Sequence, residues 1–332
     1  MISQGVLQQL ADQNWHTGAS MGEALGIGRS AIWKQIEELR ALGVHIESDR
    51  SKGYRLGDDV ALIERDEVIA NLDRASGLGI ETHHSIDSTN TRAMDLIQGG
   101  ESPLPFAVFA DHQTAGRGRR GRQWVSPIGR SLYVSIAWRF EQGISELSGL
   151  SLVVAIAIRR ALLEAGVEGV FFKWPNDLLG SLDGRDFRKL AGVLIEIQGE
   201  ATGPCAVVIG IGLNISLSDC AEDALPPIDQ PWIDVKTLCR QSGDAVNRNR
   251  LAAGVLNQLA ACLGEFTQHG FEAFKQDWHE GDAMLGESVA VLICERAVEG
   301  ECLGVDDNGG LLLSVDGVTQ QFNAGEVSLR RR

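Results

Sequence analysis

The chain has 332 residues, of which 44% are hydrophobic and 23% charged, an ordinary balance for a soluble globular protein of two or three domains. Its formal net charge of -15 argues against broad binding to nucleic acid or membrane surfaces, because such partners attract an excess of Lys and Arg, so any DNA contact must be local. The six cysteines form no Cys-x-x-Cys and no zinc-type set, and no signal-peptide pattern opens the chain, so we expect a cytoplasmic protein.

The first 57 residues predict a compact helical domain. A first helix is indicated at residues 6–10, residues 20–23 read as a capping box that starts a second helix, and a third helix begins near Gly28 and ends at Gly43. In the third helix apolar side chains recur at the 3.6-residue spacing of a buried face, at Ile32, Ile36 and Leu39.

Two short extended segments follow, at residues 44–47 and 54–56, joined by a basic turn. The order helix, helix, turn, helix, hairpin is typical of a winged helix-turn-helix, whose third helix enters the DNA major groove while the wing contacts the backbone. A helical interaction module is the alternative, since residues 1–60 carry six Lys and Arg against eight Asp and Glu. The side chains expected to face DNA are Arg29, Ser30, Trp33, Lys34, Arg50 and Lys52.

A polar link at residues 58–59 and a connecting helix at 62–72 lead into interspersed strands and helices, which are typical of a mixed α/β core. The most apolar run, 152–158, is far too short to span a bilayer, so no membrane partner is expected. The predicted strands are 106–110, 131–138, 169–173, 191–197 and 205–211, and the predicted helices are 148–165 and 249–268.

From about residue 284 the pattern changes to short alternating runs separated by turns rich in Gly, Asp and Asn. Short strands separated by turns at such even intervals predict a small closed β-barrel. Its predicted strands are 288–294, 301–305, 310–314, 318–322 and 326–329.

The most informative segment is residues 116–122, which pack four arginines and three glycines into a chain that is acidic overall. Arg offers a planar fork of donors suited to carboxylate or phosphate, and Gly lets the backbone approach a ligand. The segment lies between the strand-like runs 106–110 and 132–138, so it reads as a loop between strands rather than a disordered or RNA-binding segment. An anionic ligand or a solvated basic loop would both account for it.

Two further segments deliver cations at the ends of strands. Residues 171–177 form an apolar strand that ends in a turn with a cation, an amide and a carboxylate, although a turn alone would explain them. Residues 189–192 enter another strand, which brings Lys189 close to Lys173 if the two strands form a hairpin.

Residues 88–90 offer two hydroxyls and an amide at a helix start, where a simple N-cap is the alternative. Residues 210–214 resemble a dinucleotide loop, but Ile215 stands where the final glycine is required. The sequence has no Gly-Lys dipeptide either, so a nucleotide would bind here without either standard phosphate cradle.

Five motifs in this order behind a winged helix resemble those of the bifunctional biotin protein ligases that double as biotin operon repressors. The resemblance covers nearly the whole chain, and each motif alone is weak or moderate while the ordered set is very specific. The motifs are residues 88–90, Gln113 with 116–122, 173–177, 189–192 and 210–214.

The resemblance implies an α+β multidomain protein. Its expected parts are a winged helix-turn-helix DNA-binding domain at 1–62, a class II synthetase-like ligase domain at 67–278 that binds biotin and ATP, and an SH3-like barrel at 279–332. It further implies that the enzyme joins biotin to ATP, forms biotinyl-5'-AMP and transfers biotin to a lysine of the biotin carboxyl carrier domain of acetyl-CoA carboxylase. The adenylate would act as corepressor, with a homodimer binding operator DNA of the biotin synthesis genes.

The resemblance also assigns residue roles. The expected catalytic residues are Lys189, Arg119 and Asp177. The expected biotin-binding residues are Ser88, Thr89, Asn90, Gln113, Arg117, Gly118, Arg119, Trp124 and Lys189. The expected ATP and adenylate contacts are Arg119, Arg120, Arg122, Lys173, Asn176, Asn214 and Trp232, with Mg²⁺ near Asn176.

Two departures bear on these roles. The segment 180–188 is longer and more polar than the family requires, and the third helix begins at Gly28 and carries Trp33 where the family pattern has Ser and a small polar residue. The alternatives are a ligase without operator-specific repression, a lipoate or octanoate transferase, and a ligand-sensing transcription factor without catalysis. The Arg/Gly loop with the 173–177 turn disfavours the transferase, and the presence of Asp177 and Lys189 disfavours the non-catalytic regulator.

Overall fold

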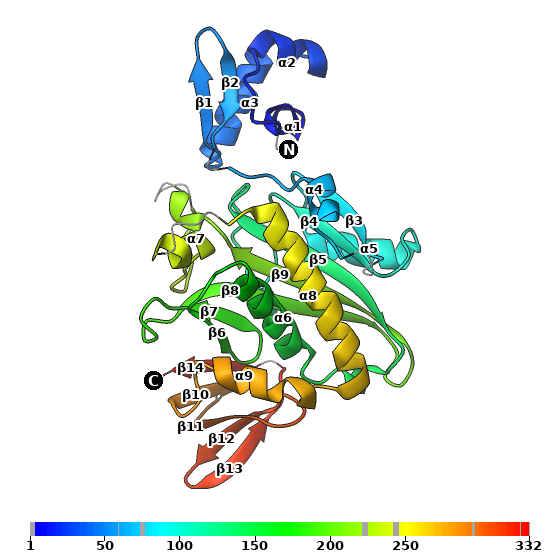
Figure 1. The fold of residues 1–332 in the computed structure, drawn as a ribbon, viewed down its shortest axis with the longest axis vertical. Coiled ribbons are helices and arrows are strands. Elements are labelled where there is room, and N and C mark those ends of the chain that lie inside the picture. The colour runs from blue at the N-terminus through cyan, green and yellow to red at the C-terminus, as the bar shows by residue number, and fades with distance from the viewer. Residues whose placement is uncertain are drawn as a thin grey trace.

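The computed structural model describes residues 4–58, 60–73, 77–220, 225–241, 246–293, 296–325 and 327–331. An N-terminal domain projects from one end of the molecule, a central domain is built on a seven-stranded sheet, and a five-stranded C-terminal sheet lies at the other end (Figure 1). No helix within the described ranges is long and apolar enough to cross a membrane.

The N-terminal domain has the predicted order of elements. They are α1 (Gln4–Leu10), α2 (Gly18–Leu25), α3 (Arg29–Ala41), β1 (Ile46–Asp49) and β2 (Gly53–Leu56). The predicted inner face of α3 is buried in the domain core. The capping box at residues 20–23 is wrong, because Thr17 caps α2 and its side chain accepts a hydrogen bond from the Ser20 amide.

The central sheet has the strand order β3-β4-β5-β9-β8-β7-β6. Among the described strands β3 and β4 pair in parallel, while the other neighbours pair antiparallel. The strands are β3 (Gly79–His83), β4 (Phe106–Ala110), β5 (Ser131–Phe140), β6 (Val170–Lys173), β7 (Asp177–Gly180), β8 (Arg188–Gly199) and β9 (Cys205–Asn214). The strands of Lys173 and Lys189 do not pair directly, because β7 pairs with both β6 and β8 and lies between them.

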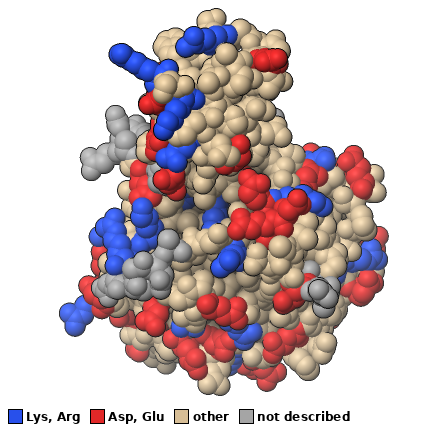
Figure 2. Space-filling view, turned by 45° about the horizontal axis from the view of Figure 1, so that its top comes forward, with Lys and Arg blue, Asp and Glu red and all other residues tan. Residues whose placement is uncertain are grey.

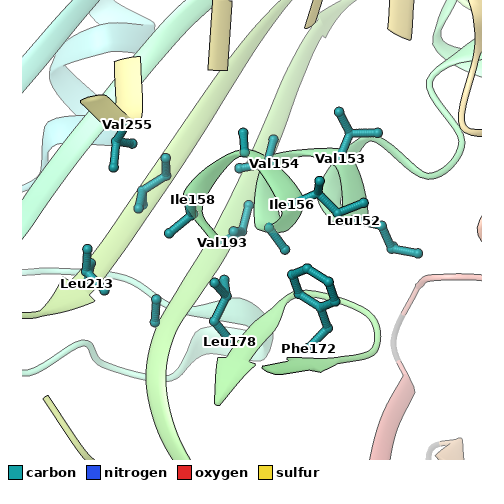
Figure 3. Packing of buried hydrophobic residues seen from close by; sticks show 14 of the residues in the cluster. Leu152, Val153, Val154, Ile156, Ile158, Phe172, Leu178, Val193, Leu213 and Val255 are labelled. Carbon is teal, nitrogen blue, oxygen red and sulfur yellow. The ribbon is translucent and has the colours of Figure 1, made fainter. Parts of the chain in front are cut away.

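Two long helices cover one face of this sheet. Leu152 and Ile156 of α6, Val193 of β8, Phe172 of β6 and Val255 of α8 belong to one buried cluster (Figure 3). The helices of the central region are α4 (Arg65–Ala70), α5 (Thr89–Gly99), α6 (Leu150–Glu164), α7 (Val235–Leu238), α8 (Arg248–His269) and α9 (Lys275–Gly281). The connecting helix α4 is shorter than the predicted 62–72, which leaves an extended link to the N-terminal domain.

The opposite face of the sheet is covered only in part. Helix α5 packs there through Ala93 and Leu96 against Val208 and other apolar side chains. Further along β5 and β9, the same face carries the small residues Ser135 and Gly210, which pair across the strands. This open, small-residue surface leaves room for a ligand.

The C-terminal sheet has the order β13-β12-β11-β10-β14, with its strands close to the predicted positions except that β11 begins at Arg296, well before the predicted start at 301. The strands are β10 (Ser288–Ile293), β11 (Arg296–Val305), β12 (Leu311–Val315), β13 (Val318–Phe322) and β14 (Val327–Arg331). The described pairings do not join β13 to β14, so closure into a barrel stays a prediction. The buried indole of Trp174 donates to the Gly309 carbonyl at 3.0 Å, which ties this sheet to the turn after β6.

The link to the N-terminal domain is held by buried polar side chains. Arg248 donates to the carboxylate of Asp111 at 2.5 Å and to the Ala61 carbonyl at 2.6 Å, and the Ile63 amide donates to Asp111 at 2.9 Å. Ile128, which follows the Arg/Gly loop, packs in the core of the N-terminal domain. The same stretch of chain therefore contacts both domains.

Candidate active site

Three glycines form the floor of a cavity on the open face of the central sheet. They are Gly192 on β8 and Gly210 and Gly212 on β9. A Cβ atom at Gly210 would lie 2.1 Å from Oδ1 of Asn90, and one at Gly212 would lie 2.5 Å from the Trp124 indole. These glycines therefore let Asn90 and Trp124 lie directly against the strands, which is the role of the 210–214 motif.

A polar wall stands at one end of this floor. Ser88 caps α5, and the amide and hydroxyl of the next residue, Thr89, donate to Oε1 of Gln113 at 2.9 and 3.1 Å. Asn90 is fixed by the Ser135 hydroxyl, which donates to its Oδ1 at 2.5 Å. The structure thus brings all four predicted polar residues, 88–90 and Gln113, into one cavity.

The Arg/Gly loop closes over the cavity as a connection between β4 and β5, as predicted. Near its start Arg117 donates to the carboxylate of Glu196 at 2.9 Å. At its centre Arg119 donates to Oδ1 of Asn176 at 2.8 Å and to the Gly325 carbonyl of the C-terminal region. The loop therefore reaches from β8 to the turn between β6 and β7.

Lys189 lies between an anion and an aromatic ring. Its ammonium is 2.8 Å from Oδ1 of Asp177, an ionic contact without hydrogen-bond geometry, and 5.2 Å from the centroid of the Trp124 ring. The indole Nε1 of Trp124 is buried without a hydrogen-bond partner. Because the lysine side chain is only 14% exposed, its charge is well placed to act on a bound anion.

A second cavity adjoins the first and is rich in cations. It shares Gly118, Arg119, Trp124, Asn176 and Lys189 with the first cavity. Its other lining residues include Arg120, Arg122, Lys173, Asp177, Gln230 and Arg330.

In this second cavity, burial first and neighbouring cations second disfavour the charged forms of the basic side chains. Burial lowers the pKa of Lys173, and Asp177 opposes that shift while Arg330 adds to it. Burial also lowers the pKa of Arg119, where Asp177 again opposes the shift. An anionic ligand would relieve this repulsion, since an opposite charge favours the protonated form of each group.

Trp232 and Asn214 lie beside these cavities. The backbone of Trp232 bridges to that of Lys189, and its side chain lines a third hollow together with Arg188 and Thr237. Asn214 is buried, and its amide donates to the carbonyls of Lys189 and Ile233 at 3.3 and 3.2 Å. Asn214 thus braces the Trp232 segment, and it is absent from the described linings of the first two cavities.

The residues predicted to face DNA are all exposed on the N-terminal domain. Trp33 is 58% exposed on α3, and the Lys34 side chain is 76% exposed beside it. Lys52 of the wing lies 5.7 Å from the Trp15 ring centroid. Figure 2 shows several Lys and Arg on one side of the projecting upper part of the molecule, with Asp and Glu also present there, whereas both signs of charge are spread over the body below.

Comparisons with known proteins agree along the whole chain. Residues 4–55 match the HTH domain family, 83–214 the Biotin/lipoate A/B protein ligase family, and 284–330 the Biotin protein ligase C terminal domain family. The bifunctional ligase/repressor BirA of Salmonella typhimurium is 38% identical over 98% of this chain and 96% of its own length. This chain belongs to the family of bifunctional biotin ligase/repressors. The family member from Escherichia coli is 37% identical over 97% of this chain and 95% of its own.

A solved structure supports the same family. The biotin protein ligase from Aquifex aeolicus in complex with biotin and ATP has 28% sequence identity and a TM-score of 0.62. The match covers 76% of this chain and 99% of that chain. The family's ligase fold is therefore present in this chain, together with the helix-turn-helix domain.

The structure adds three residues that the sequence reasoning missed. Ser135 and Glu196 hold Asn90 from opposite sides of its amide, and Arg330 brings a cation from β14 to the second cavity. Glu196 has a sequence signal, since it lies on β8 at an even spacing from Gly192 and so shares its face of the sheet. The partners of Ser135 and Arg330 depend on contacts distant in sequence.

Proposed function

We propose that the two adjoining cavities join biotin to ATP, form biotinyl-5'-AMP and pass biotin to a lysine of a carrier domain. The observation that supports this proposal most directly is that two cavities share Lys189, Arg119 and Asn176. The first cavity is polar with a floor of glycines, and the second is lined by cations. A carboxylate in the first cavity would then meet a phosphate in the second at the Lys189 ammonium.

The glycine floor of the first cavity also indicates how biotin is oriented. Asn90 lies against Gly210, whereas Trp124 and the Lys189 ammonium lie close to Gly192, which pairs with Gly212. Gly210 and Gly212 are two residues apart on β9, roughly 7 Å along the strand. We therefore place the ring of biotin at the polar wall of residues 88–90 and Gln113, and its carboxylate toward Lys189.

Adenylation requires a carboxylate to attack the α-phosphorus of ATP, which forms the acyl phosphate bond and releases pyrophosphate. Both reactants are anions, so positive charge must offset their repulsion in the transition state. Lys189 and Arg119 lie where the cavities meet, and we assign them this role. Arg120, Arg122 and Lys173 line the second cavity and would hold the phosphates. Trp232 lines the adjoining hollow on the expected adenine side, and Asn214 would act there by bracing its segment.

In the second step the amine of the carrier lysine attacks the acyl carbon and releases AMP. The amine must lose a proton, and Asp177 is the carboxylate nearest the reacting end of the cavity. It is paired with Lys189 in this structure. We infer that Lys189 turns to the phosphate as the adenylate forms, which leaves Asp177 free to accept that proton.

In this proposal Mg²⁺ would arrive bound to ATP. Oδ1 of Asn176, the expected ligand, accepts a hydrogen bond from Arg119, and Asp177 is paired with Lys189. Across the described ranges no group of three or more His, Cys, Asp and Glu could hold a metal ion. These residues do not fit a protein-held Mg²⁺, so no step is assigned to one.

We propose that residues 1–62 form the DNA-binding unit, 67–278 the catalytic domain and 279–332 the C-terminal domain. The exposed side chains of α3 and the wing support operator recognition by the first unit. A single unit with so few basic residues would bind weakly, whereas a homodimer presents two recognition helices to two half-sites. We expect the adenylate to favour that dimer and so to act as corepressor.

The proposal is tested by labelling of a biotin carboxyl carrier domain, with biotin and lipoate supplied side by side with ATP and Mg²⁺. The expected result is a mass gain of one biotin on the carrier lysine that depends on ATP. Transfer of lipoate instead would reassign the substrate. Transfer of neither would remove the ligase activity from this chain.

A further inference from the structure

Glu196 lies at the edge of the first cavity and holds two of its parts with a single oxygen atom. Its Oε2 accepts a hydrogen bond from Nδ2 of Asn90 at 2.7 Å and one from Arg117 at 2.9 Å. Asn90 belongs to the polar wall, and Arg117 stands near the start of the Arg/Gly loop. No other described carboxylate is recorded in contact with both elements.

The contact fixes the direction in which the Asn90 amide presents its groups. Ser135 donates to Oδ1 of this amide, Glu196 accepts from Nδ2, and the bare backbone of Gly210 lies beneath it. A flip of this amide would turn Oδ1 toward the carboxylate of Glu196, which can only accept hydrogen bonds, so Glu196 fixes the orientation. Its second N–H is left for a carbonyl acceptor on the ligand.

The same carboxylate anchors the Arg/Gly loop. Arg117 bridges to Gln123 through its backbone, so the loop narrows at the residue that Glu196 holds. Glu196 pairs with Val208 on β9. Val208 lies two residues from Gly210, on the side away from Lys189. The negative charge of Glu196 is therefore placed where it can hold the loop and is kept apart from the carboxylate of the substrate.

We propose that Glu196 is a positioning residue that couples the polar wall of the biotin cavity to the Arg/Gly loop. It contacts no reacting atom, and it acts by orienting Asn90 and restraining Arg117. The inference rests on the proposed function for the identity of its ligand. Its consequence is that Glu196 sets the affinity for biotin and the order of the loop while it leaves the chemical step unchanged.

The test compares Glu196→Gln with wild type in the full-length protein. Glutamine keeps the size of the side chain, but it removes the ion pair with Arg117 and replaces one acceptor oxygen with an NH2 group, so the KM for biotin should rise about three- to tenfold with kcat unchanged in a pyrophosphate-release assay. Trypsin should also cleave the 116–122 loop of the ligand-free variant about three times faster or more, because a lost ion pair raises the open population. The matched control is Glu141→Gln, which removes an exposed ion pair to Arg139 on the same sheet and should change neither quantity.

Each outcome decides the matter. A KM and a cleavage rate that match those of the Glu141→Gln control would overturn the proposal. A fall in kcat together with a lower thermal midpoint would assign Glu196 a structural role and would also overturn it. If wild type itself releases no pyrophosphate with biotin, the proposed function fails, while the ligand-free trypsin comparison still decides whether Glu196 holds the loop.

Discussion

A methyl group at position 210 is the smallest change that tests the glycine floor. The Cβ of Gly210→Ala would lie 2.1 Å from Oδ1 of Asn90, whereas ordinary carbon–oxygen contacts begin near about 3.3 Å. The backbone of Gly210 does not lie in the left-handed region, so alanine fits the strand and the conflict is confined to Asn90. Asn90 must therefore move by roughly 1 Å, a displacement that takes its amide out of reach of Ser135 and Glu196.

The size of the effect follows from those two contacts. Each hydrogen bond contributes about 0.5–1.5 kcal/mol, and the bond to a carboxylate contributes more, so the misplaced amide should cost about 1–3 kcal/mol of biotin affinity. That range corresponds to a Kd raised between about fivefold and 150-fold. The strand itself should stay folded, because the methyl group meets a side chain and no backbone atom among its nearest neighbours.

Titration calorimetry with biotin alone measures this effect without involving ATP. The matched control is Gly264→Ala on α8, where a new Cβ meets nothing within 4 Å and should stabilise the helix by about 0.5–1 kcal/mol. Its biotin affinity should equal that of wild type. A Gly210→Ala variant that binds biotin within about threefold of wild type would refute the placement of the ring beside Asn90.

Four further results are expected. Lys189→Ala should lower pyrophosphate release about 100-fold or more while biotin still binds, and activity within about threefold of wild type would remove its catalytic role. Arg119→Gly should leak the adenylate, seen as biotin on bystander proteins, unless the variant retains adenylate as long as wild type does. Changing Trp33 and Lys34 to Ala should weaken operator binding in gel shifts with biotin and ATP and leave carrier labelling intact; unchanged DNA affinity would contradict the assignment of α3. Burial raises the pKa of Asp282 to about 6, so the folded state keeps this proton to a higher pH than the unfolded chain does, and the contribution of this group to the unfolding free energy should fall by about 2 kcal/mol from pH 4 to pH 6. Asp282→Asn should lack that fall in a denaturant series, and an equal fall in both proteins would refute it.

Local signals predicted much of this fold because they depend on near neighbours along the chain. The alternating runs of the C-terminal sheet and the apolar period of α3 reappear close to their predicted bounds. The cap of α2 was misplaced because both Thr17 and Ser20 suit an N-cap, and the choice depends on where the preceding chain enters. Boundaries of this kind are decided by packing that the sequence alone does not display.

The candidate site was predicted as a set of motifs, and its internal contacts were not. Asp177 lies on a strand between those of Lys173 and Lys189 and forms an ion pair with Lys189. Glu196 and Arg330 reach the cavities through strand order and through the placement of the C-terminal sheet. Such contacts join residues far apart in sequence and follow only from the assembled fold.

The most direct test of the central claim is the identity of the small molecule that the protein retains after incubation with biotin, ATP and Mg²⁺. The protein is separated from free ligand, denatured, and the released compound is identified by mass spectrometry. Biotinyl-5'-AMP should be recovered from wild type at close to one equivalent and should be absent from Lys189→Ala. Recovery of biotin and ATP without the adenylate from wild type would contradict the claim that the two cavities form one active site.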